Sequence, residues 1–273
     1  MKKFEGLLLC SDLDGTLLNS ERTISRENRE AIDYFKAEGG YFTFITGRMP
    51  FFSVEIFDLA KPNAPFGCIN GGGIYDGYEQ KYLYTRELPL SALELAKDAI
   101  ANIDGIGVQV NHFDKLYFCK DDPSMLNFKK ITGVPFLTKD IDEISEPIAK
   151  IIFGTVHEDT MQKLENFLRS HPRADEFDFI RSEQTLFEIL PKGTNKGVLL
   201  PEFERILGVK KARIIAIGDY NNDIGMIRAA GMGIAVANAV PEAKAAADLV
   251  TVSNDEHAIA KIIGDLDEGV IRL

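Results

Sequence analysis

Strand-like and helix-like segments alternate at both ends of this chain, and this order restricts its fold more than any other feature. Apolar runs at residues 4–10 and 41–45 predict strands, and a helical pattern with a serine cap at 25–37 predicts the helix between them. The last third returns to the same order, with strands predicted at 213–217 and 233–236. Alternating strands and helices favour a parallel sheet, so we expect one α/β sheet built from both ends of the chain.

The order of elements changes between the two ends. Strand patterns at 106–110 and 115–119 predict a hairpin instead of a strand–helix–strand unit. The sequence therefore predicts a Rossmann-like parallel-sheet core, residues 1–85 and 185–273, with an inserted α+β domain, residues 86–184. Because the chain leaves the core and returns to it, we expect a hinge between the two domains.

Composition excludes several classes of protein. Hydrophobic residues form 45% of the chain, enough for a packed core, and the net charge of −11 argues against nucleic acid or an anionic membrane as a partner. The N-terminal apolar run is too short for an export signal, and no run of about 18 apolar residues could span a bilayer. Cys10, Cys68 and Cys119 lie in apolar contexts without C-x-x-C spacing, so we expect buried, reduced thiols in a cytoplasmic protein.

Two carboxylates follow the first predicted strand. Asp12 and Asp14 stand two residues apart, where the apolar run 6–10 ends in a turn that contains Gly15. Ionised carboxylates are costly to bury unless a cation or hydrogen bonds hold them. A pair at the carboxyl end of a buried strand therefore indicates a metal and an anionic ligand, with a solvated Asp-Gly turn as the alternative.

Two further clusters carry groups that suit an anion. Thr46, Gly47 and Arg48 come after a predicted strand, where a hydroxyl and backbone N–H groups could bind anionic oxygens. Lys196 opens a helix predicted over 195–207, a position that the helix dipole disfavours for a cation unless an anion also lies there. The alternatives are a surface turn for the first cluster and a solvated lysine for the second.

A fourth cluster begins at the end of another predicted strand. Its Asp-x-Asn-x-Asp core, from Asp219 to Asp223, imitates a calcium loop, but Ile224 and Ala230 stand where an EF-hand requires glycine and glutamate. We therefore reject calcium. Asp12, Asp219 and Asp223 could instead converge on one magnesium ion, which prefers oxygen ligands and keeps several waters.

Taken in order, these motifs resemble those of the haloacid dehalogenase (HAD) superfamily. The resemblance rests on Asp12-x-Asp14-Gly-Thr, Thr46-Gly-Arg, Lys196-Gly and Gly-Asp219-x-x-Asn222-Asp223. Within the superfamily the chain is similar to the Cof-type phosphatases of subfamily IIB, whose further motifs match residues 70–72, 237–239 and 247–251. The similarity covers nearly the whole chain, but the inserted domain carries no motif that indicates a substrate.

The resemblance implies a role for each motif residue. Asp12 would be the nucleophile that forms an aspartyl-phosphate, and Asp14 would protonate the leaving oxygen and then activate water. The residues that would hold the phosphate are Thr46, Gly47, Arg48, Lys196 and Asn222. The residues that would bind Mg²⁺ are Asp12, Asp14 through its backbone carbonyl, Asp219 and Asp223.

The implied function is a magnesium-dependent phosphatase that hydrolyses small phosphorylated metabolites. Sugar phosphates are the expected class, with nucleotide or vitamin phosphates, such as flavin mononucleotide or pyridoxal phosphate, as alternatives. Phosphomutase-type transfer to a second hydroxyl, or a non-catalytic sensor of phosphorylated metabolites, are the alternatives. We expect a monomer or a homodimer whose inserted domain acts as a cap that contacts the leaving group. The candidates for those contacts are His112, Lys115, Lys120, Arg181 and Ser182.

Overall fold

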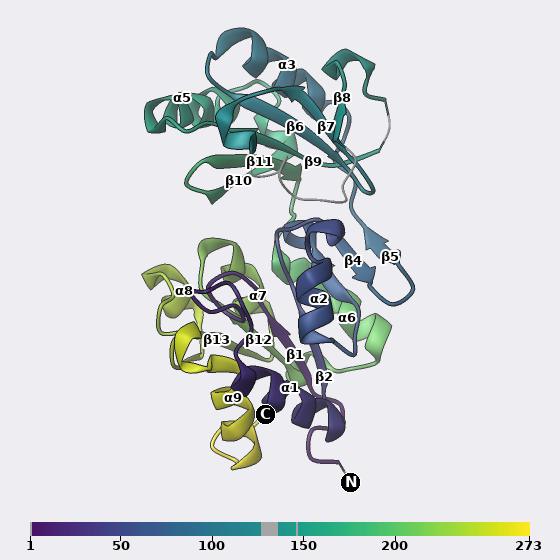
Figure 1. Cartoon of the computed structure of the whole chain (residues 1–273), viewed down its shortest axis with the longest axis vertical. Coiled ribbons are helices and arrows are strands. Elements are labelled where there is room, and N and C mark those ends of the chain that lie inside the picture. Colours follow the sequence, from purple (N-terminus) through teal and green to yellow (C-terminus); the bar gives the residue numbers. More distant parts are fainter. Residues whose placement is uncertain (1, 127–135, 146) are drawn as a thin grey trace. The chain divides into compact units, whose positions relative to one another are not determined.

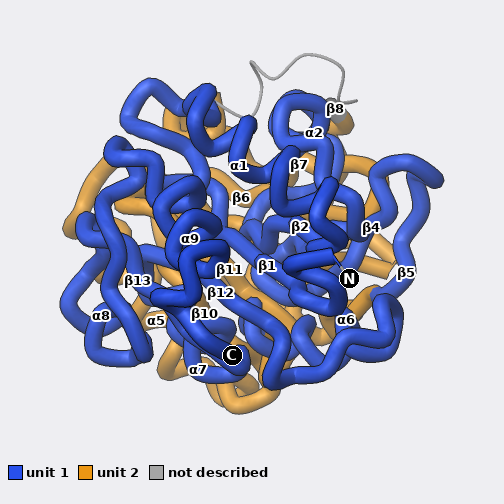
Figure 2. Tube along the Cα trace, turned by 90° about the horizontal axis from the view of Figure 1, so that it is seen from below, with its two compact units in different colours: residues 1–84, 195–273 blue, residues 85–194 orange. Residues whose placement is uncertain are grey.

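The computed structural model describes residues 2–126, 136–145 and 147–273. The chain forms two compact units: a core unit, Met1–Tyr84 with Asn195–Leu273, and an inserted unit, Thr85–Thr194 (Figure 2). Both ends of the chain therefore contribute to one unit. Each unit has its own sheet and its own hydrophobic core.

A five-stranded parallel sheet forms the centre of the core unit (Figure 1). β1 lies between β12 and β2, with Leu8 in register with Ile214 on one side and with Tyr41 on the other. All residues of β1 are buried, as expected for a strand with a neighbour at each edge. The strands, in sheet order, are β14 (Leu249–Val250), β13 (Met232–Ala235), β12 (Ile214–Gly218), β1 (Leu8–Ser11) and β2 (Tyr41–Phe44). This sheet confirms the expected α/β class.

Helices cover both faces of the core sheet (Figures 1 and 2). On one face, Phe203 of α6 and Met226 of α7 pack against Leu8 and Cys10 of β1. On the other face α1 and α9 lie against each other, and the side chain of Ser25 caps the first turn of α1 as predicted. The helices of this unit are α1 (Arg26–Ala37), α2 (Val54–Ala60), α6 (Leu200–Leu207), α7 (Ile224–Ala229), α8 (Pro241–Ala246) and α9 (Ala258–Asp267).

Two parts of the core unit differ from the sequence prediction. The single helix expected over 195–207 is a 3-10 turn, η6 (Lys196–Leu199), followed by α6, whose first turn contains Pro201. Proline lacks an N–H and suits only the start of a helix, which explains why the α-helix begins late. Helix α2 and a small sheet were not predicted; the sheet consists of β3 (Phe66–Cys68), β4 (Gly73–Asp76) and β5 (Lys81–Thr85).

A mixed six-stranded sheet forms the inserted unit, and α3 (Ala92–Asn102) and α5 (Glu158–Arg169) cover one of its faces (Figure 1). Neighbouring strands are antiparallel except β7 and β8, which are parallel. The strands, in sheet order, are β10 (Phe177–Glu183), β11 (Leu186–Pro191), β9 (Ile148–Gly154), β6 (Gly107–His112), β7 (Leu116–Lys120) and β8 (Phe136–Thr138). The predicted hairpin 106–119 is therefore β6 and β7.

The inserted unit ends later than the predicted boundary. The boundary expected after residue 184 falls between β10 and β11, which pair with each other in an antiparallel hairpin. Because β11 also pairs with β9, it stays in the inserted unit, which ends at Thr194. No helix among the described residues has both the length and the apolar character needed to cross a membrane.

Candidate active site

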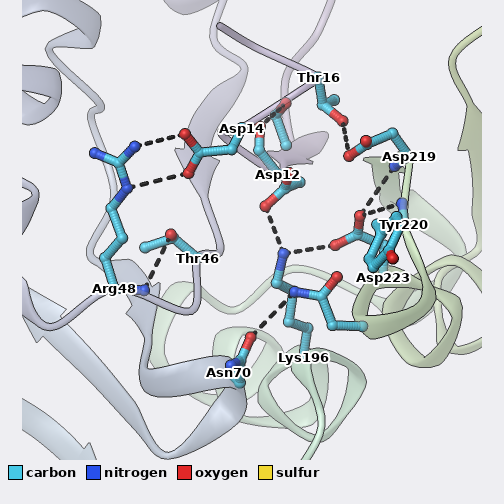
Figure 3. Close-up of polar contacts among 12 residues, drawn as sticks. Asp12, Asp14, Thr16, Thr46, Arg48, Asn70, Lys196, Asp219, Tyr220 and Asp223 are labelled. Carbon is cyan, nitrogen blue, oxygen red and sulfur yellow. Dashed lines mark hydrogen bonds and ion pairs between the residues drawn. The ribbon is translucent and has the colours of Figure 1, made fainter. Parts of the chain in front are cut away.

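The four predicted clusters lie together at the carboxyl ends of the core strands (Figure 3). Asp12 directly follows β1, Thr46 comes two residues after β2, and Asp219 directly follows β12. Lys196 opens η6, which leads into α6. Parallel strands place their carboxyl ends on one edge of a sheet, so segments far apart in the sequence meet there.

Lys196 is the centre of a buried ion-pair network (Figure 3). Its Nζ lies 2.5 Å from Oδ1 of Asp12 and 2.6 Å from Oδ1 of Asp223. The lysine is 1% exposed, Asp12 is 6% exposed and Asp223 is completely buried. The solvated lysine that the sequence allowed is therefore wrong, because this ammonium group is enclosed with two carboxylates.

The second oxygen of Asp223 holds the loop that follows β12. Its Oδ2 accepts hydrogen bonds from the backbone N–H groups of Asp219, at 2.9 Å, and of Tyr220, at 3.0 Å. The hydroxyl of Thr16, in the first motif, donates to Oδ1 of Asp219 at 3.1 Å. The carboxylate of Asp219 is thus oriented by a residue from the opposite end of the chain.

Three carboxylates could hold one metal ion. Asp12, Asp219 and Asp223 each offer an oxygen, and these oxygens all lie within 4.8 Å of one another. With a single lysine among them, the three carboxylates carry excess negative charge in a mostly buried place, which a divalent cation would neutralise. Carboxylate oxygens are the donors that Mg²⁺ prefers. The residues present therefore fit a hard divalent cation.

Burial, together with the neighbouring carboxylates, raises the pKa values of Asp12 and Asp219. Burial, reinforced by Asp223, raises the pKa of Asp12 well above its ordinary value, although Lys196 opposes the shift. Burial and Asp223 also raise the pKa of Asp219 to about 6. Burial alone would lower the pKa of Lys196, but Asp12 and Asp223 outweigh it and raise that pKa. A nearby cation would favour the ionised form of each carboxylate.

The side chain of Asp14 turns toward Arg48 and forms a separate ion pair (Figure 3). Nη2 of Arg48 lies 2.5 Å from Oδ1 of Asp14, and Nε lies 3.1 Å from Oδ2. The side chain of Asp14 is 54% exposed, in contrast to the buried network beside it. The group of three carboxylates that could hold a metal ion thus does not include Asp14. Ligation through its backbone carbonyl stays a prediction.

Thr46 connects the second motif to the segment after β3. Its Oγ1 accepts a hydrogen bond from the backbone N–H of Arg48 at 3.2 Å, and its carbonyl accepts one from the N–H of Asn70 at 3.1 Å. Oδ1 of Asn70 accepts from Nδ2 of Asn222 at 3.2 Å. A Cβ at Gly47 would lie 2.8 Å from Oδ1 of Asn70, so any larger residue there would have to displace this amide.

Gly15 allows the first and fourth motifs to approach each other. Its φ is +83°, which favours glycine, and a Cβ there would lie 2.5 Å from Oδ2 of Asp219. The carbonyl of Gly15 accepts a hydrogen bond from Nδ2 of Asn238 at 2.8 Å. The turn after β1 is therefore held against both later segments.

Most of the expected substrate contacts in the inserted unit are engaged in structural interactions. Lys120 donates to two backbone carbonyls at the end of α3, and Arg181 forms an ion pair with α5. The ring of His112 contacts a carboxylate two residues later, and Lys115 lies over an aromatic ring of β7. The hydroxyl of Ser182 is buried and has no hydrogen-bond partner among the described residues.

The sequence interpretation did not assign a role to Thr16 or Asn70. Thr16 belongs to the first motif. Because the first and fourth motifs are both predicted at one edge of the sheet, its hydroxyl could have been expected near the fourth motif. Asn70 has φ +53°, a conformation that asparagine tolerates better than most residues. Its place in an Asn-Gly-Gly sequence was the available signal.

Comparison with known proteins gives consistent matches. Residues 9–263 match the model of the haloacid dehalogenase-like hydrolases. The putative phosphatase YxeH of Bacillus subtilis is 32% identical over 272 residues, which cover 95% of this chain and 97% of that protein. The 5-amino-6-(5-phospho-D-ribitylamino)uracil phosphatase YwtE of Bacillus subtilis is 31% identical over 96% of this chain and 98% of its own length.

A solved structure agrees with these sequence matches. The crystal structure of a haloacid dehalogenase-like hydrolase from Bacteroides thetaiotaomicron has a TM-score of 0.83 and 26% identity, with 95% of this chain and 99% of that chain covered. The match extends over both units, so it includes the inserted one. The chain belongs to the haloacid dehalogenase-like hydrolases and is a phosphatase of the Cof-type branch that its motifs predicted.

Proposed function

We propose that the protein is a magnesium-dependent phosphatase that hydrolyses small phosphorylated metabolites through an aspartyl-phosphate on Asp12. The observation that carries this proposal is the convergence of Asp12, Asp219 and Asp223 around Lys196. A carboxylate nucleophile and a phosphate dianion repel each other, so the reaction needs positive charge beside both. Lys196 and a divalent cation would supply that charge.

In the first step, an oxygen of Asp12 attacks phosphorus and the bond from phosphorus to the ester oxygen breaks. Asp14 gives its proton to the leaving oxygen, which departs as an alcohol. In the second step, water attacks the phosphorus of the aspartyl-phosphate, and Asp14 takes a proton from that water. Inorganic phosphate leaves, and Asp12 and Asp14 return to their initial states.

The ion pair between Asp14 and Arg48 adds a condition to this sequence of steps. Arg48 donates to both oxygens of Asp14, so at least one of these hydrogen bonds must be released, and Asp14 must take up a proton from solvent, before it can deliver a proton. We propose that the arriving phosphate attracts the guanidinium group and releases the carboxylate. Arginine suits this exchange, because its planar donors bind carboxylate and phosphate in the same bidentate manner.

The remaining polar groups would hold the phosphoryl oxygens. Lys196 contacts the nucleophile, and Thr46 follows β2, the strand next to β1, with Gly47 beside it in sequence and Asn222 bound to Asn70. Asp12, the carbonyl of Asp14, Asp219 and Asp223 would be the residues that hold Mg²⁺. When bound, this ion would stabilise negative charge on the phosphoryl group.

Phosphorylated sugars and polyols are the proposed substrate class. The relative YwtE is named for a substrate whose phosphate is attached to a ribityl chain, which is a polyol. We further propose a cytoplasmic monomer or homodimer, and the three free cysteines support a reducing location. Cys10 and Cys68 are buried as expected, whereas Cys119 is half-buried.

A phosphate-release screen tests the proposal. Purified protein is incubated with a panel of sugar, alditol and nucleoside monophosphates and with p-nitrophenyl phosphate, with Mg²⁺ or with excess chelator. We expect free phosphate only in the presence of the metal. Appearance of an isomeric sugar phosphate without free phosphate would indicate a mutase, and binding without turnover would indicate a sensor. Undiminished release in the chelator would contradict the metal requirement.

A further inference from the structure

The segment that follows β3 contains two consecutive residues in the left-handed conformation, and neither is glycine. Ile69 has φ +58°, and Asn70 has φ +53° and ψ +28°. Asparagine tolerates this conformation better than most residues, but for a β-branched residue such as isoleucine it is a genuine outlier. Both residues are buried, so this is not an ordinary surface turn. Backbone strain of this kind persists only where the surrounding structure holds it, and it is typical of functional sites.

Backbone hydrogen bonds attach the strained segment to the second motif, residues 46–48. The N–H of Ile69 donates to the carbonyl of Arg48 at 3.0 Å, and the N–H of Asn70 donates to the carbonyl of Thr46 at 3.1 Å. These two carbonyls lie on either side of Gly47. The side-chain amide of Asn70 packs against Gly47, because a Cβ at that glycine would lie 2.8 Å from Oδ1 of Asn70. The left-handed pair therefore holds the loop that is proposed to bind phosphate.

The same segment contacts the third motif, which begins at Lys196. Gly71 has φ +106°, and a Cβ there would lie 2.2 Å from the carbonyl oxygen of Asn195, so this close approach requires glycine. The side chain of Asn195 accepts a hydrogen bond from the N–H of Gly197 and caps η6. Residues 69–71 thus lie against both the second and the third motifs.

The side chain of Asn70 connects the segment to the fourth motif. Its Oδ1 accepts a hydrogen bond from Nδ2 of Asn222 at 3.2 Å (Figure 3). Exchanging oxygen and nitrogen in both amides would keep this bond and only reverse its direction. Asn70 is 1% exposed, so its amide is shielded from bulk water. Because an amide group is planar, the bond fixes the direction in which Asn222 presents its remaining hydrogen-bonding capacity.

We propose that Asn70 is a positioning residue whose amide orients Asn222 toward the phosphoryl oxygens. This inference rests on the proposed phosphatase function, in which Asn222 binds the phosphoryl group. In this role Asn70 acts through Asn222 and does not itself contact the substrate. A donor that is oriented before the substrate arrives stabilises developing charge better than one that must first be ordered. The strained backbone at Ile69 and Asn70 brings the orienting amide to the required place.

A double-mutant cycle of Asn70→Gly and Asn222→Ala tests the inference. Glycine adopts a positive φ without strain, so Asn70→Gly removes the amide and keeps the backbone contacts. The kcat/KM for p-nitrophenyl phosphate is measured for the wild type, both single variants and the double variant. We expect Asn222→Ala to lower it about 10- to 100-fold, because a hydrogen bond to a charged group is lost. Asn70→Gly should lower it by about 5- to 50-fold.

The double variant distinguishes positioning from a structural role. If Asn70 acts through Asn222, the double variant should lie within about twofold of Asn222→Ala alone. Two independent structural effects would instead multiply. Calorimetric titration with inorganic phosphate in the presence of Mg²⁺ measures the same contact without turnover. The affinity for phosphate should fall in both single variants and no further in the double variant.

The matched control is Gln80→Gly, in the turn between β4 and β5. Gln80 is exposed and also has a left-handed φ, +52°, so this variant makes the same kind of backbone change away from the motifs. Its kcat/KM should stay within about twofold of the wild type, and circular dichroism should show intact folds for all variants.

Asn70→Asp keeps the test open if glycine at this position prevents folding. Aspartate tolerates the left-handed conformation and retains an acceptor for Asn222. Its kcat should stay within about threefold of the wild type, while KM rises because the added charge repels phosphate. A fall in kcat as large as that of Asn222→Ala would contradict the inference.

Two results of the cycle would overturn the inference: losses that multiply in the double variant, or an Asn70→Gly variant with unchanged kcat/KM and phosphate affinity. A wild type that binds phosphate but cleaves no ester would overturn the proposed function instead, and the phosphate titrations would still test the positioning of Asn222. A wild type that neither binds phosphate nor cleaves an ester would overturn both.

Discussion

Each unit of the protein buries a lysine, and the two lysines have different surroundings. In the core unit, Lys196 contacts Asp12 and Asp223, and Asp219 completes a group of three carboxylates. In the inserted unit, Lys150 forms an ion pair with Glu188, and both side chains are only 4% exposed. The core network has more negative than positive charge, whereas the pair in the inserted unit is balanced.

This difference in charge indicates which of the two buried clusters needs a further cation. Buried carboxylates in excess of their cations are unfavourable, so a divalent cation would complete the core network, and a phosphate dianion could then approach it. A balanced pair needs no ion. Its neighbours on the sheet, Gln109 and Asn111, carry uncharged amides.

The largest expected effect is that of Asp12→Asn. The amide cannot act as the nucleophile, so kcat should fall by at least about 10⁴-fold with every ester, while circular dichroism shows an intact fold. The control is Asp98→Asn, an exposed carboxylate of α3 that should leave kcat unchanged. Appreciable turnover in the Asp12 variant, with no reversion to aspartate by mass spectrometry, would remove the nucleophile from the mechanism.

The two buried lysines give the next comparison. Lys196→Met should lower kcat/KM for p-nitrophenyl phosphate by about 10²–10³-fold, because a positive charge beside the phosphoryl oxygens is lost. Lys150→Met should leave this value within about twofold but lower the free energy of unfolding by about 3 kcal/mol, because the cation paired with Glu188 is removed. Steady-state kinetics and urea unfolding measure these effects. Equal losses of kcat/KM in the two variants would contradict the prediction that only Lys196 acts in catalysis.

The pH dependence of metal binding tests the charge excess in the core. Asp219, whose pKa is raised to about 6, must be ionised to bind a cation, so protonation competes with the metal below that pH. We expect the affinity for Mg²⁺ to be constant above pH 7 or so and to fall about tenfold for each pH unit below about 6. Calorimetric titration of metal-free protein measures this slope. An affinity independent of pH between about 5 and 7 would exclude Asp219 as a ligand that titrates there.

The smallest expected effect concerns exposed charges of the inserted unit. Arg173 forms ion pairs with Glu94 and Glu176, and all three side chains are more than a third exposed. Arg173→Ala should therefore lower the free energy of unfolding by less than about 1 kcal/mol and leave kcat/KM unchanged. Urea unfolding at low and high salt checks this, since salt should reduce the difference further. If Arg173→Ala lowered the free energy of unfolding as much as Lys150→Met, then burial would not explain the difference between the Arg173 ion pairs and the Lys150–Glu188 pair.

Much of the core unit could be predicted from the sequence. Apolar runs that alternate with helical patterns indicate a parallel sheet, and the polar clusters after 4–10, 41–45 and 213–217 were therefore expected at one edge. The structure brings them together there. The order of β1 between β12 and β2 is what sets Asp12 beside Asp219, and spacing along the chain alone does not encode that order.

The inserted unit was harder to predict from the sequence than the core unit, because its strand β9 does not show an alternating pattern. In β9 every residue is buried, so the strand shows no alternation and Lys150 looks like an interruption of an apolar run. The placing of Lys150 beside Glu188 depends on the register of β9 and β11, which a single strand's sequence does not specify. The predicted contacts at turns and strand ends were instead engaged locally, as the ion pair of Arg181 shows.

The pairing of β1 with β12 has a consequence for the way the protein is made. On the ribosome, the nucleophile at Asp12 is synthesised early, but its partners Lys196, Asp219 and Asp223 emerge only after the whole inserted unit. A nascent chain therefore cannot assemble the acidic cluster until Asp223 has been translated, 211 residues after Asp12. Phosphate esters in the surrounding medium meet a working enzyme only after the last core strands have joined the sheet.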